Sequence, residues 1–247
     1  MLLQTQALTK SFGRLIAVNE IDIEVQKGDL HAIIGPNGAG KSTFFNLLSG
    51  LLKPDSGKIF YRKEEITKLP PHRICQMGIS KSFQVASIYP LLSVFENVQG
   101  ALFSTKGKSL SFFSSAKKIL VKETYRILEN VELVDKADIP GGELSQGDRK
   151  QLELGIVLAN EPELLLLDEP TAGMSPEETT GTMELIKRMR NERDLTIIFT
   201  EHDMSVVFGM ATRISVLHQG SLIADGEPEK VRADEKVHKI YLGEEAN

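Results

Sequence analysis

One stretch of the chain is more informative than any other: Gly35-Pro36-Asn37-Gly38-Ala39-Gly40-Lys41-Ser42-Thr43. It matches the pattern G-x-x-x-x-G-K-[ST] of the phosphate-binding P-loop. Its glycines have no Cβ and accept positive φ, so the backbone can turn tightly around a phosphate. Successive N–H groups then point inward and form an anion-binding nest. A helix beginning at Gly40–Lys41 would add the partial positive charge of its N-terminus.

The residues on either side of the loop support this interpretation. A strand is predicted over Leu30–Ile34, and the apolar residues after the loop have helical spacing at Phe44, Leu47, Leu48 and Leu51. The alternative, a glycine-rich turn with an accidental Lys-Ser pair, explains neither flank. We therefore expect the whole loop to bind a nucleotide, with Lys41 reaching its β- and γ-phosphates and Ser42 ligating Mg²⁺.

The composition is ordinary for a globular protein. The 247 residues are enough for one large α/β domain, or for a domain with a subdomain. No apolar run approaches the roughly 18 residues that a membrane span needs, and the first residues do not resemble a signal peptide, so we expect a cytosolic protein. The net charge of −5 argues against broad nucleic-acid binding. The single cysteine, Cys75, excludes an internal disulfide.

Strand patterns predict an N-terminal antiparallel β subdomain beside a nucleotide-binding core. The segments concerned are Leu3–Leu8, Ile21–Val25 and Lys58–Tyr61. Residues 85–142 instead have the pattern of an inserted α-helical subdomain. Two helices are expected there, over Ser93–Leu102 and Ala116–Val131, with a loop over 104–115 between them.

The rest of the chain, residues 1–84 and 143–247, is expected to form the core together with the β subdomain. After residue 142 strand patterns alternate with helical ones, which predicts a mostly parallel sheet with its site at the carboxyl ends of the strands. The predicted strands are Glu163–Leu167, Leu195–Thr200 and a hairpin of Arg213–His218 with Ser221–Ala224. The predicted helices are Ser145–Ala159, Pro176–Asn191 and Asp203–Ala211. The fold class is thus α/β, a P-loop NTPase core with two subdomains.

Two adjacent carboxylates end one of these strands, in Leu164-Leu165-Leu166-Leu167-Asp168-Glu169. Asp168 is placed to hold Mg²⁺ through water, and Glu169 can polarise an attacking water as general base. The alternative is a buried strand followed by a solvated acidic turn, and the P-loop earlier in the chain argues against it. A weaker signal lies at Leu144–Asp148, where Ser145 can cap a helix and Asp148 can reach back to it. That segment alone indicates only a well-capped helix.

These motifs, in their order, resemble those of the ATP-binding-cassette (ABC) ATPases over essentially the whole chain. The order is a P-loop, a glutamine after a strand, an L-S-x-G segment, the apolar D-E strand and a later histidine. The resemblance implies that Gln84 contacts Mg²⁺ and the attacking water, that His202 contacts the γ-phosphate, and that Phe12 stacks on adenine. On local grounds alone, His202 could be a surface residue at a helix start and Phe12 a core aromatic.

The resemblance implies ATP and Mg²⁺ as the cofactors. The catalytic residues would be Lys41, Gln84, Glu169 and His202, and the metal-binding residues Ser42, Gln84 and Asp168.

The resemblance also implies a second subunit. In that family the L-S-x-G segment closes over ATP held by another cassette, so Ser145 and Gly147 would face its γ-phosphate in a head-to-tail homo- or heterodimer. The chain departs from the family's L-S-G-G-Q at Gln146 and Asp148, and from its S-A-L-D at Ser175. An acidic Asp148 should repel a partner's phosphates unless it is turned into its own cap.

Four segments are similar to the ATP-binding subunits of branched-chain amino-acid and urea importers, and lipopolysaccharide-export ATPases share several of them. They are Ser82-Phe83-Gln84, Ser93–Val98, Ala172-Gly173-Met174 and Tyr241-Leu242-Gly243. The leading hypothesis is an ATPase that drives solute transport through separate transmembrane permease subunits. It would lie on the cytoplasmic face of the inner (plasma) membrane, held there by its partner.

Three alternatives remain, one within the class of transport ATPases and two from other classes. A lipopolysaccharide-export-type ATPase would use the same site. A non-transport ABC ATPase, acting in DNA repair, translation or cofactor assembly, often has two cassettes or long inserted arms, whereas this chain has one P-loop. A P-loop kinase or GTPase would leave Leu144–Asp148 and His202 unexplained, and a GTPase should have an N-K-x-D segment that this sequence lacks.

Overall fold

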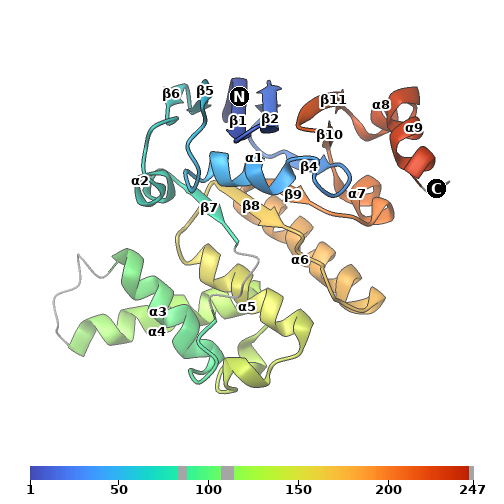
Figure 1. Cartoon of the computed structure of the whole chain (residues 1–247). Coiled ribbons are helices and arrows are strands. Elements are labelled where there is room, and N and C mark those ends of the chain that lie inside the picture. Colours follow the sequence, from blue (N-terminus) through green and yellow to red (C-terminus); the bar gives the residue numbers. More distant parts are fainter. Residues whose placement is uncertain (83–87, 107–113, 245–247) are drawn as a thin grey trace.

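The computed structural model describes residues 1–82, 88–106 and 114–244. Two sheets and the helices around them form most of this part of the chain (Figure 1). The helix α1 (Lys41–Leu48) and the antiparallel sheet pack on one face of the larger sheet. The helices α5 (Gln146–Leu158) and α6 (Pro176–Arg193) pack on its other face.

In the described part of the chain, the larger sheet has six strands in the order β11-β10-β4-β9-β8-β7. Their bounds are β4 Leu30–Ile34, β7 Ile79–Lys81, β8 Leu164–Asp168, β9 Thr196–Thr200, β10 Arg213–His218 and β11 Ser221–Gly226. All neighbours pair in parallel except β10 and β11. The predicted mostly parallel sheet is confirmed, and the carboxyl ends of β4, β8 and β9 meet at one edge.

The smaller sheet is antiparallel, as predicted for the start of the chain. Its order is β2-β1-β5-β6, with β3 paired to β1. The bounds are β1 Leu3–Phe12, β2 Leu15–Ile21, β3 Glu24–Val25, β5 Ser56–Tyr61 and β6 Glu64–Glu65.

The prediction of one strand over Ile21–Val25 was wrong. The strand β2 ends at Ile21, and β3 pairs separately with the start of β1. Between them the Asp22 carboxylate accepts a hydrogen bond from Ala7 N (2.6 Å) and takes the place of a strand partner. The predicted shared face is nevertheless real, because Ile21, Ile23 and Val25 are all buried.

Alternate residues of the parallel strands serve two separate cores. In β8, Leu164 and Leu166 pack with α1 and the antiparallel sheet, while Leu165 and Leu167 pack with the helices of the other face. All four side chains are fully buried, which explains the unbroken apolar run in the sequence. Burial of each leucine is worth about 1.5–3 kcal/mol. The residues that follow β8 are therefore held at a firmly packed position.

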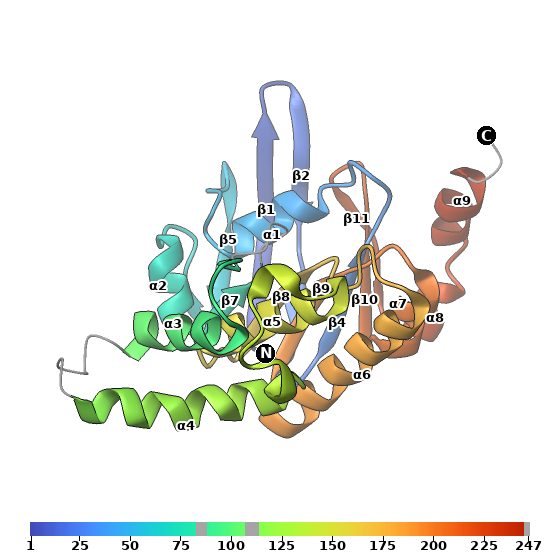
Figure 2. The ribbon, with the colours of Figure 1, turned by 90° about the horizontal axis from the view of Figure 1, so that it is seen from below.

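The helical part below the sheets in Figure 1 contains α3 (Val94–Lys106) and α4 (Ser114–Asn130) beside α5. Seen from below, α4 lies alongside α3 and extends outward (Figure 2). The predicted loop over 104–115 was wrong at both ends. The hydroxyls of Ser104 and Thr105 donate to carbonyls one turn back, so these two residues continue α3. The division of the chain into 1–84, 85–142 and 143–247 stays a prediction.

The remaining helices are short or lie late in the chain. They are α2 Pro71–Gln76, η1 Val134–Lys136, η2 Gly141–Glu143, α7 Met204–Met210, α8 Pro228–Arg232 and α9 Glu235–Glu244. In the described ranges, no helix combines the length and apolarity needed to cross a membrane.

A buried histidine ties the strand before the P-loop to its neighbour. His31 in β4 is fully buried, and its Nε2 lies 2.7 Å from Ser215 Oγ in β10. The Ser215 hydroxyl donates to Asp225 Oδ1 (2.7 Å), which leaves its oxygen to accept from His31. Burial lowers the pKa of His31 to about 4, in spite of the nearby Asp225 carboxylate. His31 is therefore neutral at pH 7 and can remain inside the sheet.

Candidate functional site

The P-loop connects β4 to α1, as its flanking patterns predicted. Gly40 is the N-cap of α1, at φ 103°, and no described side chain caps this helix. The first turn also contains no acidic residue. Its backbone N–H groups are thus left to a ligand, and the helix N-terminus favours an anion.

Lys41 lies inside the loop. Its Nζ donates to Gly35 O (2.6 Å) and Pro36 O (3.1 Å), and its side chain is buried. Burial lowers the pKa of Lys41, while the Glu169 and Asp168 carboxylates act in the opposite direction. The P-loop and the end of β8 therefore belong to one electrostatic site.

Asp168 ends β8 and is buried. Its Oδ1 accepts from Thr200 Oγ1 (2.8 Å) at the end of β9, whereas its Oδ2 has no hydrogen-bond partner in the described ranges. Lys81 Nζ lies 3.6 Å from Oδ2. A buried carboxylate oxygen without a hydrogen bond fits a role toward Mg²⁺.

The described residues hold no group of three or more His, Cys, Asp or Glu that could bind a metal ion. Mg²⁺ in nucleotide sites keeps several waters and uses one or two protein groups plus phosphates. Asp168 and Ser42, which lines the same cavity as the P-loop, are suited to this partial coordination.

Glu169 follows Asp168 with a positive φ of 51°. Its N–H donates to Thr200 Oγ1 (3.0 Å), and its Oε1 lies 2.9 Å from His202 Nε2. The two side chains are partly exposed, with 29% and 50% of their surface accessible. An accessible carboxylate held by an imidazole can take a proton from water. The sequence interpretation missed Thr200, although its position at the end of the neighbouring strand was a usable signal.

A cavity of about 280 Å³ joins the P-loop to the antiparallel sheet. It is lined by residues 37–43, by Glu169, and by Phe12, Leu15 and Ala17 of the β1–β2 hairpin. Phe12 and Leu15 expose 48% and 67% of their surface. Exposed apolar side chains beside a phosphate loop suit a flat ligand such as a nucleobase.

The L-S-x-G segment forms the start of α5. Ser145 is the N-cap, and its Oγ accepts from Asp148 N (3.1 Å), as predicted. The predicted return contact of Asp148 is wrong, because its carboxylate binds Lys136 Nζ with both oxygens at 2.6 Å. An ammonium is a stronger partner for a carboxylate than a backbone N–H. Gly147 N donates to Glu178 Oε1 (3.2 Å) in the first turn of α6.

Ser175 starts α6 with a full capping box. Its Oγ accepts from Glu178 N (3.2 Å), and Glu178 Oε2 accepts from Ser175 N (3.0 Å). A serine at this position therefore starts the helix without an aspartate. The sequence interpretation missed Lys136 and Glu178. For Glu178 a signal was present, because the spacing S-x-x-E predicts its contact with Ser175.

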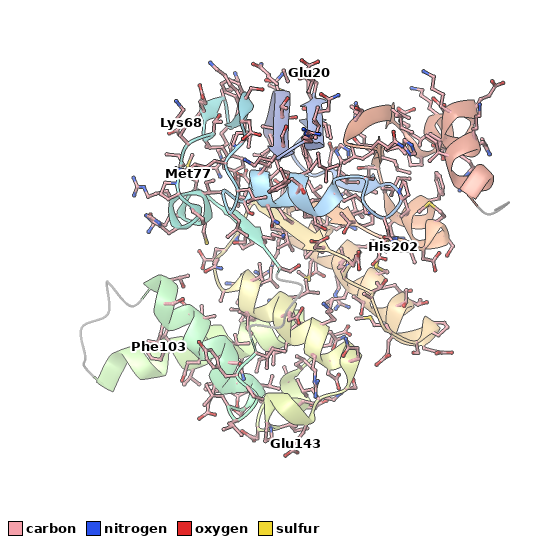
Figure 3. The ribbon with its side chains drawn as sticks, viewed as in Figure 1. Glu20, Lys68, Met77, Phe103, Glu143 and His202 are labelled. Atoms are coloured by element: carbon pink, nitrogen blue, oxygen red, sulfur yellow. The ribbon has the colours of Figure 1, made fainter. Side chains whose placement is uncertain are left out.

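The structure does not bring every candidate residue together. Gln84 lies outside the described residues. Ser145 and Gly147 do not line the nucleotide cavity. Figure 3 shows Glu143, just before α5, at the far end of the helical part from His202. A second cavity of about 330 Å³, next to Arg126 and Arg193, lies away from the P-loop.

A parallel sheet that runs into a P-loop, with an acidic pair at the end of β8, defines a P-loop nucleoside triphosphatase of the α/β class. A family model described as "ABC transporter" matches residues 18–172, and one described as "Branched-chain amino acid ATP-binding cassette transporter" matches residues 221–247. The chain belongs to the ABC transporter family. It is an ATP-binding subunit and an ATPase.

Known relatives cover the chain almost completely. It is 38% identical to the high-affinity branched-chain amino acid transport ATP-binding protein LivG of Escherichia coli, over 98% of each chain. It is 32% identical to the lipopolysaccharide export system ATP-binding protein LptB of Acidithiobacillus ferridurans, over 99% of this chain and 98% of that one.

Solved structures agree with these relatives. The ADP conformation of MJ1267, an ATP-binding cassette of an ABC transporter, superposes with a TM-score of 0.86 and 31% identity over 98% of each chain. A dimeric structure of MJ0796, a bacterial ABC transporter cassette, superposes with a TM-score of 0.79 and 25% identity, over 92% of this chain and 98% of that one.

Proposed function

We propose that this chain drives the permease subunits of a branched-chain amino-acid importer with ATP. The observation that supports this most directly is the match of residues 221–247 to the branched-chain amino-acid model, in a segment that lies outside the general ABC match. The identity to LivG over nearly the whole chain agrees with it. The lower identity to LptB makes lipopolysaccharide export the second candidate.

In the proposed reaction, the P-loop and Lys41 hold the phosphates of ATP, and Phe12 stacks on adenine. Ser42, Asp168 and Gln84 are the residues assigned to Mg²⁺, which would offset the negative charge of the β- and γ-phosphates. The Oδ2 of Asp168, which has no hydrogen-bond partner among the described residues, supports its part in this assignment.

Glu169 is the proposed general base. It accepts a proton from the water that attacks the γ-phosphate, and His202 holds its carboxylate toward that water. The 2.9 Å contact between His202 Nε2 and Glu169 Oε1 supports this pairing. Thr200 acts as a positioning residue, since its hydroxyl contacts both Asp168 and the backbone of Glu169.

A second cassette would complete each site. Ser145 and Gly147 lie outside the cavity that holds the P-loop of their own chain, so they are available to ATP bound by another copy or a related subunit. The Ser145 oxygen already accepts from Asp148 N, which leaves the hydroxyl hydrogen to donate to a phosphate.

The Lys136–Asp148 ion pair leads to a testable prediction about this second site. Lys136→Met would leave Asp148 as an unpaired negative charge near the partner's phosphates. Because the pair is partly exposed, we expect only about a threefold rise in the ATP concentration that half-saturates hydrolysis. In an Asp148→Gln background the same change should have no effect. An equal rise in the half-saturating ATP concentration in both backgrounds would show that Lys136 acts independently of Asp148.

A surface for the permease is proposed on residues 88–92, which lie just before α3 in the chain. Tyr89 and Leu91 expose 68% and 92% of their surface. Their backbone is held in place, because Asn97 contacts Tyr89 and Gly141 N donates to Leu92 O (2.9 Å). A partner that covers these side chains would place the chain at the cytoplasmic face of the inner membrane.

Co-purification from native membranes tests this proposal. The tagged chain is expected to bring down transmembrane permease subunits, and Leu91→Asp is expected to release them. The complex, reconstituted with an amino-acid-binding protein that serves the same permease, should hydrolyse ATP faster when leucine, isoleucine or valine is present. Stimulation by lipopolysaccharide instead would favour the second candidate, and recovery of only ribosomes or DNA would contradict transport.

A further inference from the structure

The Glu178 carboxylate joins the starts of two helices. Its Oε1 accepts from Gly147 N at the beginning of α5, and its Oε2 accepts from Ser175 N at the beginning of α6. The two helices contact each other, and their buried residues belong to the same hydrophobic core. One side chain thus serves two helix N-termini, which are both places where an anion is favoured.

The fit between Glu178 and Gly147 is close. A Cβ at Gly147 would lie 2.9 Å from Glu178 Oε1, so glycine is what allows the carboxylate to reach this backbone. The backbone N–H groups of Ser175 and Gly147 hold the pKa of Glu178 below its usual range. Glu178 is therefore charged at neutral pH, and a full negative charge lies on the N–H of Gly147.

The same N–H is the group that the proposed function assigns to the γ-phosphate of ATP on the second cassette. One N–H cannot make two well-aligned hydrogen bonds, and two anions at the same helix start repel each other. Glu178 must leave Gly147 before the phosphate can bind there.

We propose that Glu178 is an internal substitute for the partner's γ-phosphate, a positioning residue that holds the signature helix in the open subunit and is displaced when ATP closes the dimer. This inference rests on the proposed second cassette. It assigns Glu178 two effects. The carboxylate competes with ATP during closure, and it reoccupies Gly147 after phosphate leaves and so favours reopening.

The neighbouring charges fit this competition. Asp148 lies close enough to Glu178 for the two carboxylates to repel each other. Lys136 binds both oxygens of the Asp148 carboxylate. Glu178 is then the carboxylate that contacts the backbone of the L-S-x-G segment, at Gly147 N. Lys136 therefore holds the Asp148 carboxylate, and the hydroxyl hydrogen of Ser145 stays available to a phosphate.

The test uses the full chain with Glu169→Gln, in which an ATP-bound dimer should accumulate. Light scattering measures the ATP concentration that gives half-maximal dimer. Adding Glu178→Gln is expected to lower that concentration about fivefold, because a neutral amide holds the N–H more weakly than a carboxylate. Glu178→Asp should shift it in the same direction, since the shorter side chain keeps the acid in the first turn of α6 but cannot reach Gly147.

Glu177→Gln is the matched control, because Glu177 is an exposed acid in the same helical turn. It should change the half-maximal concentration less than twofold. In the chain with Glu169 intact, Glu178→Gln should lower KM for ATP without raising kcat. A structural role alone would lower the melting temperature and leave KM unchanged.

The outcomes separate the two proposals. If the Glu169→Gln chain dimerises with ATP but neither Glu178 variant lowers the required concentration, Glu178 does not compete with phosphate. If the Glu169→Gln chain fails to dimerise with ATP at all, the second cassette is not another copy of this chain, and the competition proposed for such a dimer is contradicted.

Discussion

Replacing Glu169 with Gln is expected to slow ATP hydrolysis by about 10²–10⁴-fold and to leave ATP binding intact. The amide has nearly the same shape and keeps an oxygen for His202 Nε2, which lies 2.9 Å from the carboxylate. It cannot accept a proton from water, so only the chemical step is lost. The variant should consequently accumulate as an ATP-bound dimer.

Steady-state hydrolysis and equilibrium ATP binding check this prediction. Glu20→Gln is a suitable control, because it removes the same charge from an exposed residue at the top of the view, away from His202 (Figure 3). It should leave both measurements unchanged. A fully active Glu169→Gln enzyme would contradict the assignment of the general base, and a loss of ATP binding would show that the carboxylate has another role.

Replacing Gly40 with Ala is expected to destabilise the apo chain by about 3 kcal/mol or more. Gly40 has φ 103° and packs against the β1–β2 hairpin, where an added Cβ would lie 2.1 Å from Ala17 O. That oxygen belongs to the backbone and cannot turn away as a side chain would. The P-loop must therefore shift, and ATP binding should be lost with it.

Gly38→Ala provides the matched control for the Gly40 variant. Gly38 also has positive φ, at 79°, but no described atom lies within 4 Å of an added Cβ. Only the conformational cost remains, about 1–2 kcal/mol. Calorimetry without nucleotide should show a drop in Tm of about 10 °C for Gly40→Ala and a clearly smaller one for Gly38→Ala. Equal drops would contradict the steric explanation.

Short-range patterns in the sequence were sufficient for much of the fold. The P-loop between Leu30–Ile34 and α1, and the acid pair after the apolar run of β8, were predicted at their observed places. Periodicity, capping residues and turn residues act within a few positions, so the sequence displays them directly. The β1–β2 hairpin was harder to predict, because Leu15–Ile21 is half exposed and lacks a clean alternation.

Boundaries failed where a contact from elsewhere overrode the local pattern. Asp22 interrupts the expected strand over Ile21–Val25 by binding Ala7. Hydroxyl bonds to the preceding turn extend α3 through Ser104 and Thr105, two residues that the composition alone assigns to a loop. Both cases depend on hydrogen bonds that residue types permit but do not require.

The chemical identity of the site was therefore present in the linear chain, because a phosphate loop and a strand ending in Asp168-Glu169 are local motifs. The pairings that control the site were not. Thr200 with Asp168, Lys136 with Asp148, and Glu178 with Gly147 join residues 32, 12 and 31 positions apart. Which residues pair in this way depends on how the strands and helices pack. Only the folded chain shows that the acidic Asp148 is neutralised and that Gly147 is already occupied by a carboxylate.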